Sequence, residues 1–411
     1  MKKRLSILLI LALTLSVLTG CGGGKTDPAE EPTAAPTAEA TAAPTAAPED
    51  EEVPDAEETA EETAEAYAAF SEAVQHARTA IDPDTVIATV DGEPLPWELF
   101  YYYVANDLQE AYYYLGRIPE DFTEVLSGET TWQSYFTASA LRQSVFLLEG
   151  DRRAADMGVE LSEEQRATLD GTWDRVVADY GDEELLQADL RDACLDKDLF
   201  LRILESNMKI TAVMNELYGA NGEKLSDAEV VAWAAENGYV RTKHVLWSFL
   251  DEDGTALDDE AKAALREKLE DLVAELRTLV DDADALEARF DELMNSESAD
   301  LGGLEGFPAG YTYSAGTMVP AFEDAAFALG DYELSDPVET DYGYHILLGL
   351  PLEPDGLTMD QDANTGEYMT LRQTAANELF NRQLVEWIDS AQVEWAEGYE
   401  DLDFNALFHG E

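Results

Sequence analysis

The sequence predicts an α+β protein in which a segment of β-α-α-α-β-β order, residues 240–351, is inserted into a mainly α-helical domain. Three observations lead to this prediction. Helical patterns dominate the chain as far as residue 239. At Val240 the pattern changes to a strand rich in β-branched and aromatic residues. After Pro351 another long helical pattern begins, and we expect it to pack against the first helical domain.

Residues 1–20 are predicted to be a signal segment. Basic residues at positions 2–4 precede an apolar stretch, residues 5–18, that is too short for a usual membrane-spanning helix. The stretch closes on the letters LTGC, which resemble the lipobox of bacterial lipoproteins. That resemblance implies cleavage before Cys21 and acylation of Cys21, palmitate included, which would anchor the chain at the extracytoplasmic face of the cell membrane. The alternative is an ordinary secretion signal in which Cys21 is incidental.

Residues 21–66 are predicted to be a disordered, acidic tether. They are rich in Pro, Ala, Thr and Glu and nearly free of large apolar side chains, so they cannot bury enough surface to fold. The whole chain carries 88 acidic and 25 basic residues, a formal net charge of −63. This charge argues against nucleic acid as a partner, because phosphate binding requires clustered Lys and Arg.

Residues 67–239 are predicted to form the N-terminal part of the helical domain. The letters "DTVIATV" indicate a strand, Asp91-Gly92 a tight turn, and the following residues a helix from about Pro96. A single long helix is expected from Glu183 to Tyr218, with Cys194 packed on it as a small buried residue.

Two capping boxes mark further helix starts in this part of the chain. Ser162 with Gln165 opens one helix, and Ser226 with Glu229 opens another.

Residues 240–351 combine strands and amphipathic helices. "VRTKHVLWSFL" indicates a strand, and residues 258–280 form an apolar stripe typical of a helix. A second short helix, a Gly-rich loop and the helix "VPAFEDAAFAL" follow. "DPVET" and "GYHILLG" indicate the last two strands. Residues 352–411 are then predicted to be a C-terminal helix, with Phe380, Leu384 and Trp387 at helical spacing.

Three motifs in residues 240–351 resemble the parvulin family of peptidyl-prolyl cis/trans isomerases. They are "RTKHVLW", "GTMVPAFEDAAFAL" and "PVETDYGYHILL", in the family's order. The flanking helices are similar to the chaperone part of secreted parvulin-type foldases, both Gram-positive lipoproteins and periplasmic proteins. The reaction that this resemblance implies is rotation about an X–Pro bond, whose barrier is ~20 kcal/mol. No bond is broken, so neither a metal nor a cofactor is expected.

The resemblance also implies a site. It places His244 and His345 in one hydrogen-bond network, with Thr340 before the last strand and a Cys or Asp ahead of a Gly-Gly pair. Counting back from Gly302-Gly303 without gaps puts that position at Ser296, with Glu297 and Asp300 as alternatives if the loop shifts register.

A substrate slot for the proline ring is the second part of the expected site. Met318 and Phe322 match the family's slot and lie four residues apart on a helix start, so they face the same way. Tyr313 and Tyr342 are expected to contact substrate too. For the family's slot-lining leucine, the loop "GGLEGFPAGYTYSAG" leaves Leu304, Tyr311 and Tyr313 as alternatives.

The sequence therefore predicts a lipid-anchored extracytoplasmic foldase whose partners are unfolded or newly secreted polypeptides. The rival prediction is a pure holdase with a catalytically weak parvulin module that serves for binding. The tyrosines at 101–103 and 112–114 are expected to be core or helix-packing positions, with a surface that binds apolar, unfolded chains as the alternative. A solute-binding lipoprotein fits the lipobox but not the helix-dominated layout, which lacks repeated βαβ units. The oligomeric state is not predicted.

Overall fold

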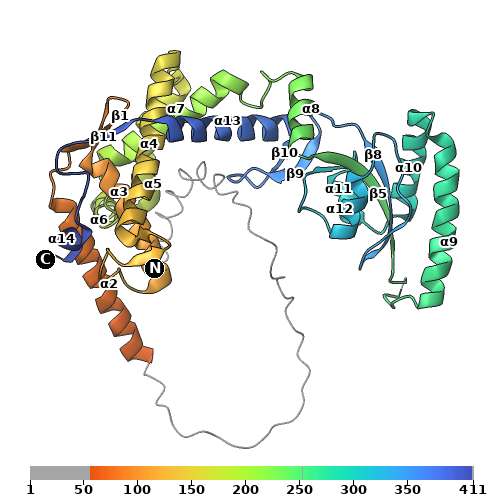
Figure 1. The fold of residues 1–411 in the computed structure, drawn as a ribbon, viewed down its shortest axis with the longest axis horizontal. Coiled ribbons are helices and arrows are strands. Elements are labelled where there is room, and N and C mark those ends of the chain that lie inside the picture. The colour runs from red at the N-terminus through yellow and green to blue at the C-terminus, as the bar shows by residue number, and fades with distance from the viewer. Residues whose placement is uncertain (1–55, 252, 410–411) are drawn as a thin grey trace, which may run out of the picture. The chain divides into compact units, whose positions relative to one another are not determined.

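The computed structural model describes residues 56–251 and 253–409 (Figure 1). The predicted signal segment, Cys21 and the tether as far as residue 55 lie outside these residues. The described chain divides into a helical unit and an α+β unit. The helical unit contains the residues up to 213 together with those from 384 onward, and the α+β unit contains residues 214–383. Within the described ranges, no helix is both long and apolar enough to cross a membrane.

The helical unit contains most of the helices. They are α2 (Ala56–Thr79), α3 (Trp97–Leu115), α4 (Trp132–Met157), α5 (Glu163–Tyr180), α6 (Glu183–Asp192), most of α7 (Lys197–Tyr218), the last turns of α13 (Leu371–Ser390), and α14 (Phe404–His409). Because α2 begins at Ala56, the prediction of a disordered tether as far as residue 66 is wrong for its last residues. That segment is dominated by Ala and Glu, which are strong helix formers.

A small sheet joins the two ends of the chain in the helical unit. It has the order β11-β1-β2, with β1 (Val86–Val90), β2 (Glu93–Pro96) and β11 (Val393–Trp395). The predicted turn at Asp91-Gly92 connects β1 to β2, and both residues have positive φ, 48° and 89°, as a two-residue hairpin turn requires. Strand β11 pairs antiparallel with β1, with Ala88 opposite Trp395. A second hairpin joins β3 (Val125–Ser127) to β4 (Thr130–Thr131).

The expected helix from Glu183 to Tyr218 is broken. Helix α6 ends at Asp192 and α7 begins at Lys197. Between them Cys194 has φ 57°, and the Asp196 side chain accepts the backbone N–H of Leu199 at 2.9 Å, which caps the new helix. Cys194 therefore lies in a turn rather than on a helix, although it is buried as expected.

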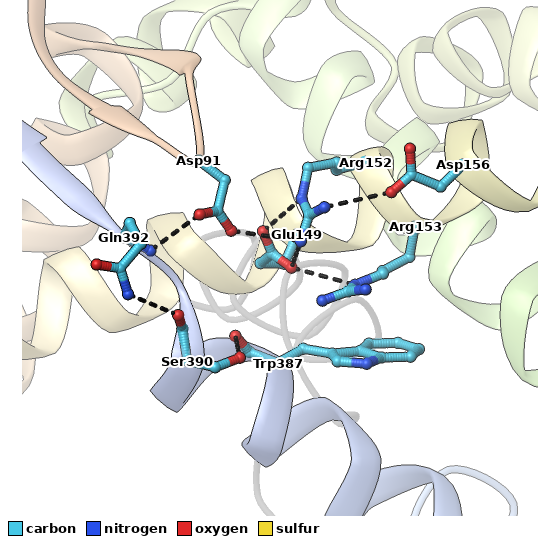
Figure 2. Close-up of polar contacts among 8 residues, drawn as sticks. All are labelled: Asp91, Glu149, Arg152, Arg153, Asp156, Trp387, Ser390 and Gln392. Carbon is cyan, nitrogen blue, oxygen red and sulfur yellow. Dashed lines mark hydrogen bonds and ion pairs between the residues drawn. The ribbon is translucent and has the colours of Figure 1, made fainter.

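A buried carboxylate ties α4 to neighbouring segments of the helical unit (Figure 2). Glu149 is 1% exposed and accepts two hydrogen bonds from Arg152, at 2.8 and 2.7 Å, and one from Arg153 at 3.3 Å. Arg152 also pairs with Asp91 of the β1–β2 turn at 3.3 Å, and the Arg153 guanidinium lies 4.7 Å from the ring centre of Trp387 on α13. The cluster therefore connects α4 with the hairpin turn and the end of α13.

The α+β unit is built around a four-stranded antiparallel sheet of order β6-β5-β8-β7. Its strands are β5 (Val240–Ser248), β6 (Tyr311–Tyr313), β7 (Val338–Glu339) and β8 (Gly343–Leu350). Its helices are α8 (Asp227–Glu236), α9 (Asp259–Leu276) with the 3₁₀ turn η1 (Arg277–Leu279), α10 (Ala283–Glu297), α11 (Leu301–Gly306) and α12 (Pro320–Phe327), followed by the first turns of α13. The predicted α+β class is confirmed. Both predicted capping boxes form, at the starts of α5 and α8.

Two parts of the α+β unit differ from the prediction. The expected Gly-rich loop contains α11 and strand β6, and the predicted C-terminal helix is preceded by a hairpin of β9 (Leu357–Gln361) and β10 (Tyr368–Thr370). Helix α11 forms because the Asp300 side chain accepts the backbone N–H of Gly303 at 3.0 Å and caps it.

Strand alternation separates two cores in the α+β unit. Val245 and Trp247 of β5 pack with Ile346 of β8 against the apolar faces of α9 and α10. The alternate residues of β5 and β8 point to the other face of the sheet. On that face Leu347 packs with Phe322 of α12. Because successive side chains of a strand point to opposite faces, His244 and His345 both face the α12 side.

Candidate active site

The two predicted histidines meet on one face of the sheet. In the β5–β8 ladder His244 is opposite Leu347 and His345 is opposite Leu246. The histidines are thus diagonal neighbours, within reach of ring side chains. Their Nδ1 atoms lie 3.1 Å apart, and both residues are buried.

Asp300 supplies an acidic end to this pair. Its Oδ2 lies 2.8 Å from His244 Nε2 and accepts the Tyr311 hydroxyl at 2.8 Å. Its other oxygen caps α11 through Gly303, so the carboxylate is held on both sides. Hydrogen bonds from His244, the larger cause, and from Tyr311 hold the pKa of Asp300 well below its ordinary value. The carboxylate therefore stays ionised.

Thr340 supplies the other end. Its Oγ1 lies 2.9 Å from His345 Nε2 and accepts the backbone N–H of Tyr342 at 3.2 Å. The turn from Thr340 to Gly343 brings the chain against β5, where a Cβ on Gly343 would lie 2.1 Å from the Trp247 carbonyl oxygen. A glycine is therefore required at the start of β8 for this close approach.

One assignment of protons satisfies every link of this chain when both imidazoles are neutral. His244 donates its Nε2–H to the ionised Asp300, so its Nδ1 carries no proton. That Nδ1 accepts a hydrogen bond from the Nδ1–H of His345. His345 Nε2 then accepts the hydroxyl of Thr340. Burial is the main cause that lowers the pKa of His345 from 6.5 to about 4, and the neighbouring His244 lowers it further. The ring of His345 is therefore neutral at neutral pH. With this assignment, hydrogen bonds run without a break from Asp300 through both imidazoles to Thr340.

An apolar cluster lies against the histidines. The ring of Phe322 meets both imidazoles edge-on, with centroid distances of 5.1 Å to His244 and 5.3 Å to His345. Tyr313 packs in the same cluster, and Met318 lies half-buried against it, so the structure brings the expected slot residues together. Phe322 itself is 3% exposed, so only the edge of this slot faces solvent.

Ser296 does not fit the predicted network, and Tyr342 contacts that network through its backbone alone. Ser296 lies on the last turn of α10, where its side chain is exposed and its hydroxyl donates to the Glu292 carbonyl at 2.8 Å. Counting back without gaps therefore gave the wrong residue. The chain continues for three residues beyond the end of α10 before it reaches His244, at Asp300, the cap of α11. Tyr342 is 63% exposed and meets the network through its backbone N–H rather than its ring.

The open alternatives are also separated by the structure. Asp300 occupies the place for which Ser296 and Glu297 were considered. Glu297 instead accepts the Trp247 indole N–H at 3.1 Å. Leu304 packs against the core on the α9 and α10 side, whereas Tyr311 packs against the Phe322 cluster. The role of Tyr311 as the partner of Asp300 was missed, because a hydroxyl eleven residues away in sequence carries no local signal.

Comparison with known sequences agrees with this geometry. Residues 244–349 match the family described as the PPIC-type PPIase domain, or rotamase. The foldase protein PrsA of Oceanobacillus iheyensis is 33% identical over 136 residues, which is 33% of this chain but only 40% of that foldase. The putative peptidyl-prolyl cis-trans isomerase Cbf2 of Campylobacter jejuni is 27% identical over 232 residues, 54% of this chain and 78% of the relative. Chaperone SurA of Methylobacillus flagellatus is 36% identical over 108 residues, 26% of this chain and 24% of the chaperone.

Similar solved structures include PrsA from Bacillus subtilis, at 21% identity over 70% of this chain and 99% of that chain, with a TM-score of 0.22. PrsA from Bacillus cereus is 14% identical over 71% of this chain and 97% of that chain, with a TM-score of 0.27. The family match, with the sequence relatives beside it, confirms the resemblance seen in the three motifs. Residues 244–349 of this chain are therefore a match to the parvulin-type, or PPIC-type, peptidyl-prolyl isomerase domain.

Proposed function

We propose that this protein is a foldase that isomerises X–Pro bonds in unfolded, newly secreted polypeptides at the extracytoplasmic face of the cell membrane. The observation that carries the proposal is the fixed chain from Asp300 through the two histidines to Thr340, set beside the Phe322 slot. The names of the foldase and isomerase relatives support it.

The proposed mechanism holds a twisted amide rather than moving a proton. The proline ring binds in the slot against Phe322, and the hydrogen-bonded histidines form the polar wall that faces the rotating carbonyl. The wall keeps its dipoles fixed while the bond rotates, so it stabilises the twisted state without reorganising. Because Phe322 is 3% exposed, a proline ring reaches it only when side chains at the edge, such as the flexible Met318, rotate aside.

The test is a protease-coupled proline assay on the full chain with several X–Pro peptides. Phe322→Ala should lower kcat/KM by about thirtyfold, which corresponds to ~2 kcal/mol of lost transition-state stabilisation. Phe327→Ala is the matched control, because it lies on the same helix but is 38% exposed, and it should retain activity. Circular dichroism must show that both variants are folded. A folded Phe322→Ala variant with full activity, or a wild-type chain with none, would remove the proposal.

The proposed membrane anchor depends on Cys21, in the LTGC motif. Cys21→Ala should release the protein from the membrane fraction or leave an uncut precursor. A variant that is still processed and still sediments with membranes would contradict the anchor while leaving the isomerase proposal intact.

A second candidate function is holding unfolded chains without catalysis. It is favoured by large apolar side chains exposed at the end of α3 and in β3, namely Tyr113 (84%), Tyr114 (76%), Leu115 (49%), Val125 (63%) and Leu126 (41%). Such side chains bind apolar segments of other chains. Suppression of aggregation of a denatured test protein, compared between the wild type and a Tyr113→Ser, Tyr114→Ser double variant, measures this activity independently of the isomerase site.

A further inference from the structure

The β9–β10 hairpin lies outside the matched domain but belongs to the same unit as the site. Strand β9 runs beside the edge strand β6, which carries Tyr311 and Tyr313. The hairpin therefore lies against the edge strand that carries two of the tyrosines beside the slot.

The hairpin is firmly fixed at its base. Thr358 is fully buried, and its hydroxyl donates to the Met369 carbonyl at 3.1 Å. Arg372, directly after the hairpin, pairs with Asp355 at 2.7 Å and with Asp227 of α8 at 2.6 Å. The first bond joins the two strands of the hairpin, and the ion pair with Asp227 attaches the chain directly after it to α8.

A further bond ties the hairpin to the sheet. The Tyr239 hydroxyl, just before β5, donates to Asp360 at 2.7 Å. The neighbouring residue, Met359, is thereby held toward the sheet edge.

Two hairpin side chains reach the site. Met359 packs, half-buried, against the cluster that contains Phe322 and Tyr313. Tyr368 meets Phe307 edge-on with a centroid distance of 4.8 Å, and Phe307 lies 5.1 Å from Tyr311, the residue that holds Asp300. The hairpin thus contacts the slot cluster directly through Met359. It is linked to Tyr311, the partner of Asp300, through the ring of Phe307.

We propose that Met359 forms a wall of the proline slot and determines which X–Pro sequences the site accepts. The inference rests on the proposed isomerase function. With Met318, it gives the edge of the slot two unbranched, polarisable side chains that adapt to apolar groups of different shapes. The residue favoured next to the proline is accordingly a large apolar one, such as Leu, rather than a small or acidic one.

The test compares Met359→Ala with Met369→Ala in the full chain. Met369 is the matched control, because it is also a half-buried methionine of this hairpin, but its sulfur accepts from Asn377 at 3.2 Å instead of packing in the slot cluster. Peptides with Leu, Ala or Glu before proline are assayed. The wild-type preference for Leu over Ala should fall about tenfold in Met359→Ala, the size of effect that a lost apolar wall produces, and remain in Met369→Ala. Unchanged preferences in a folded Met359→Ala variant would overturn the inference.

A second measurement separates this inference from the proposed function. Methionine methyl groups are labelled with ¹³C, and the chain is titrated with a Leu–Pro peptide. A shift of the Met359 methyl signal in a chain without isomerase activity would support the wall while removing the proposed catalysis. If the chain is active but the Met359 signal is unmoved at saturating peptide, the wall is wrong and the catalysis stands. If the chain is inactive and the signal does not move, both fail.

Discussion

At the scale of single residues, the site depends on one carboxylate that two hydrogen-bond donors share. Asp300 accepts from His244 and from Tyr311, both at 2.8 Å, and both donors are largely screened from water. Asp300→Ala leaves these donors without their acceptor, and a lost charge-assisted hydrogen bond of this kind costs ~1.5–3 kcal/mol. We expect kcat/KM in the peptide assay to fall at least tenfold.

Ser296→Ala is the control for this prediction. It removes an exposed hydroxyl that donates within its own helix, so activity should be unchanged. If Ser296→Ala were inactive and Asp300→Ala fully active, the position in the network would have to be reassigned.

The pH dependence of activity also follows from single residues. The pKa of His345 is lowered to about 4, so the neutral ring that the network needs is present well above that pH. We expect kcat/KM to be flat between about pH 6 and 8 and to fall as pH approaches 4. A lowered pKa also means that the neutral ring stabilises the fold, a contribution fully present above the ordinary pKa of 6.5 and lost as pH falls through about 4. A bell-shaped profile centred near 6.5 would instead indicate proton transfer.

At the scale of elements, the Glu149 cluster shown in Figure 2 makes the packing of α4 testable. Removing one partner of a buried ion pair costs ~3–5 kcal/mol, but Arg152 and Arg153 are 24% and 26% exposed and regain water in part. We expect Glu149→Gln to lower the free energy of unfolding in urea by about 2 kcal/mol. Asp156→Asn is the control, because Asp156 is 59% exposed and also pairs with Arg152, and it should cost less than about 1 kcal/mol. Equal effects of the two would contradict the importance of burial.

The elements that the sequence predicted well are those with local signals. The Asp91-Gly92 turn and the box of Ser226 with Glu229 depend on residues at most three apart. The elements that it missed depend on distant contacts. Strand β9 alternates apolar and polar residues, but the polar Thr358 is buried and the apolar Leu357 is exposed. Thr358 contacts Thr374 of α13 and Met359 packs against the slot cluster, and neither contact is local in sequence.

The candidate site shows the same division. Both histidines and Phe322 could be placed, because each lies in a continuous motif. Asp300 remained one alternative among three, because the loop before α11 has no fixed length from which to count. Its identity becomes visible only when β5 folds beside it and presents His244.

At the scale of the whole molecule, the net charge of −63 predicts a response to salt. Like charges repel across a folded surface, and salt screens them beyond a Debye length of ~8–10 Å. The melting temperature should therefore rise from low to moderate NaCl, and KCl should act equally, because screening does not depend on the cation. A flat or falling trend would mean that the acidic residues are concentrated away from the folded units or are already paired.

The pairing of β1 with β11 has a consequence for the order in which the molecule can be completed. Asp91 and Gln392 are 301 residues apart in sequence, yet they exchange hydrogen bonds beside this pairing. In a chain synthesised from its N-terminus, β1 is made early, and its partner β11 becomes available only about 300 residues later. Residues 214–383 are complete before that moment and can fold while the first strand still has an open edge. Strand β11 thus closes the edge of β1 late in synthesis, and a chain cut before Val393 would leave β1 without that neighbour.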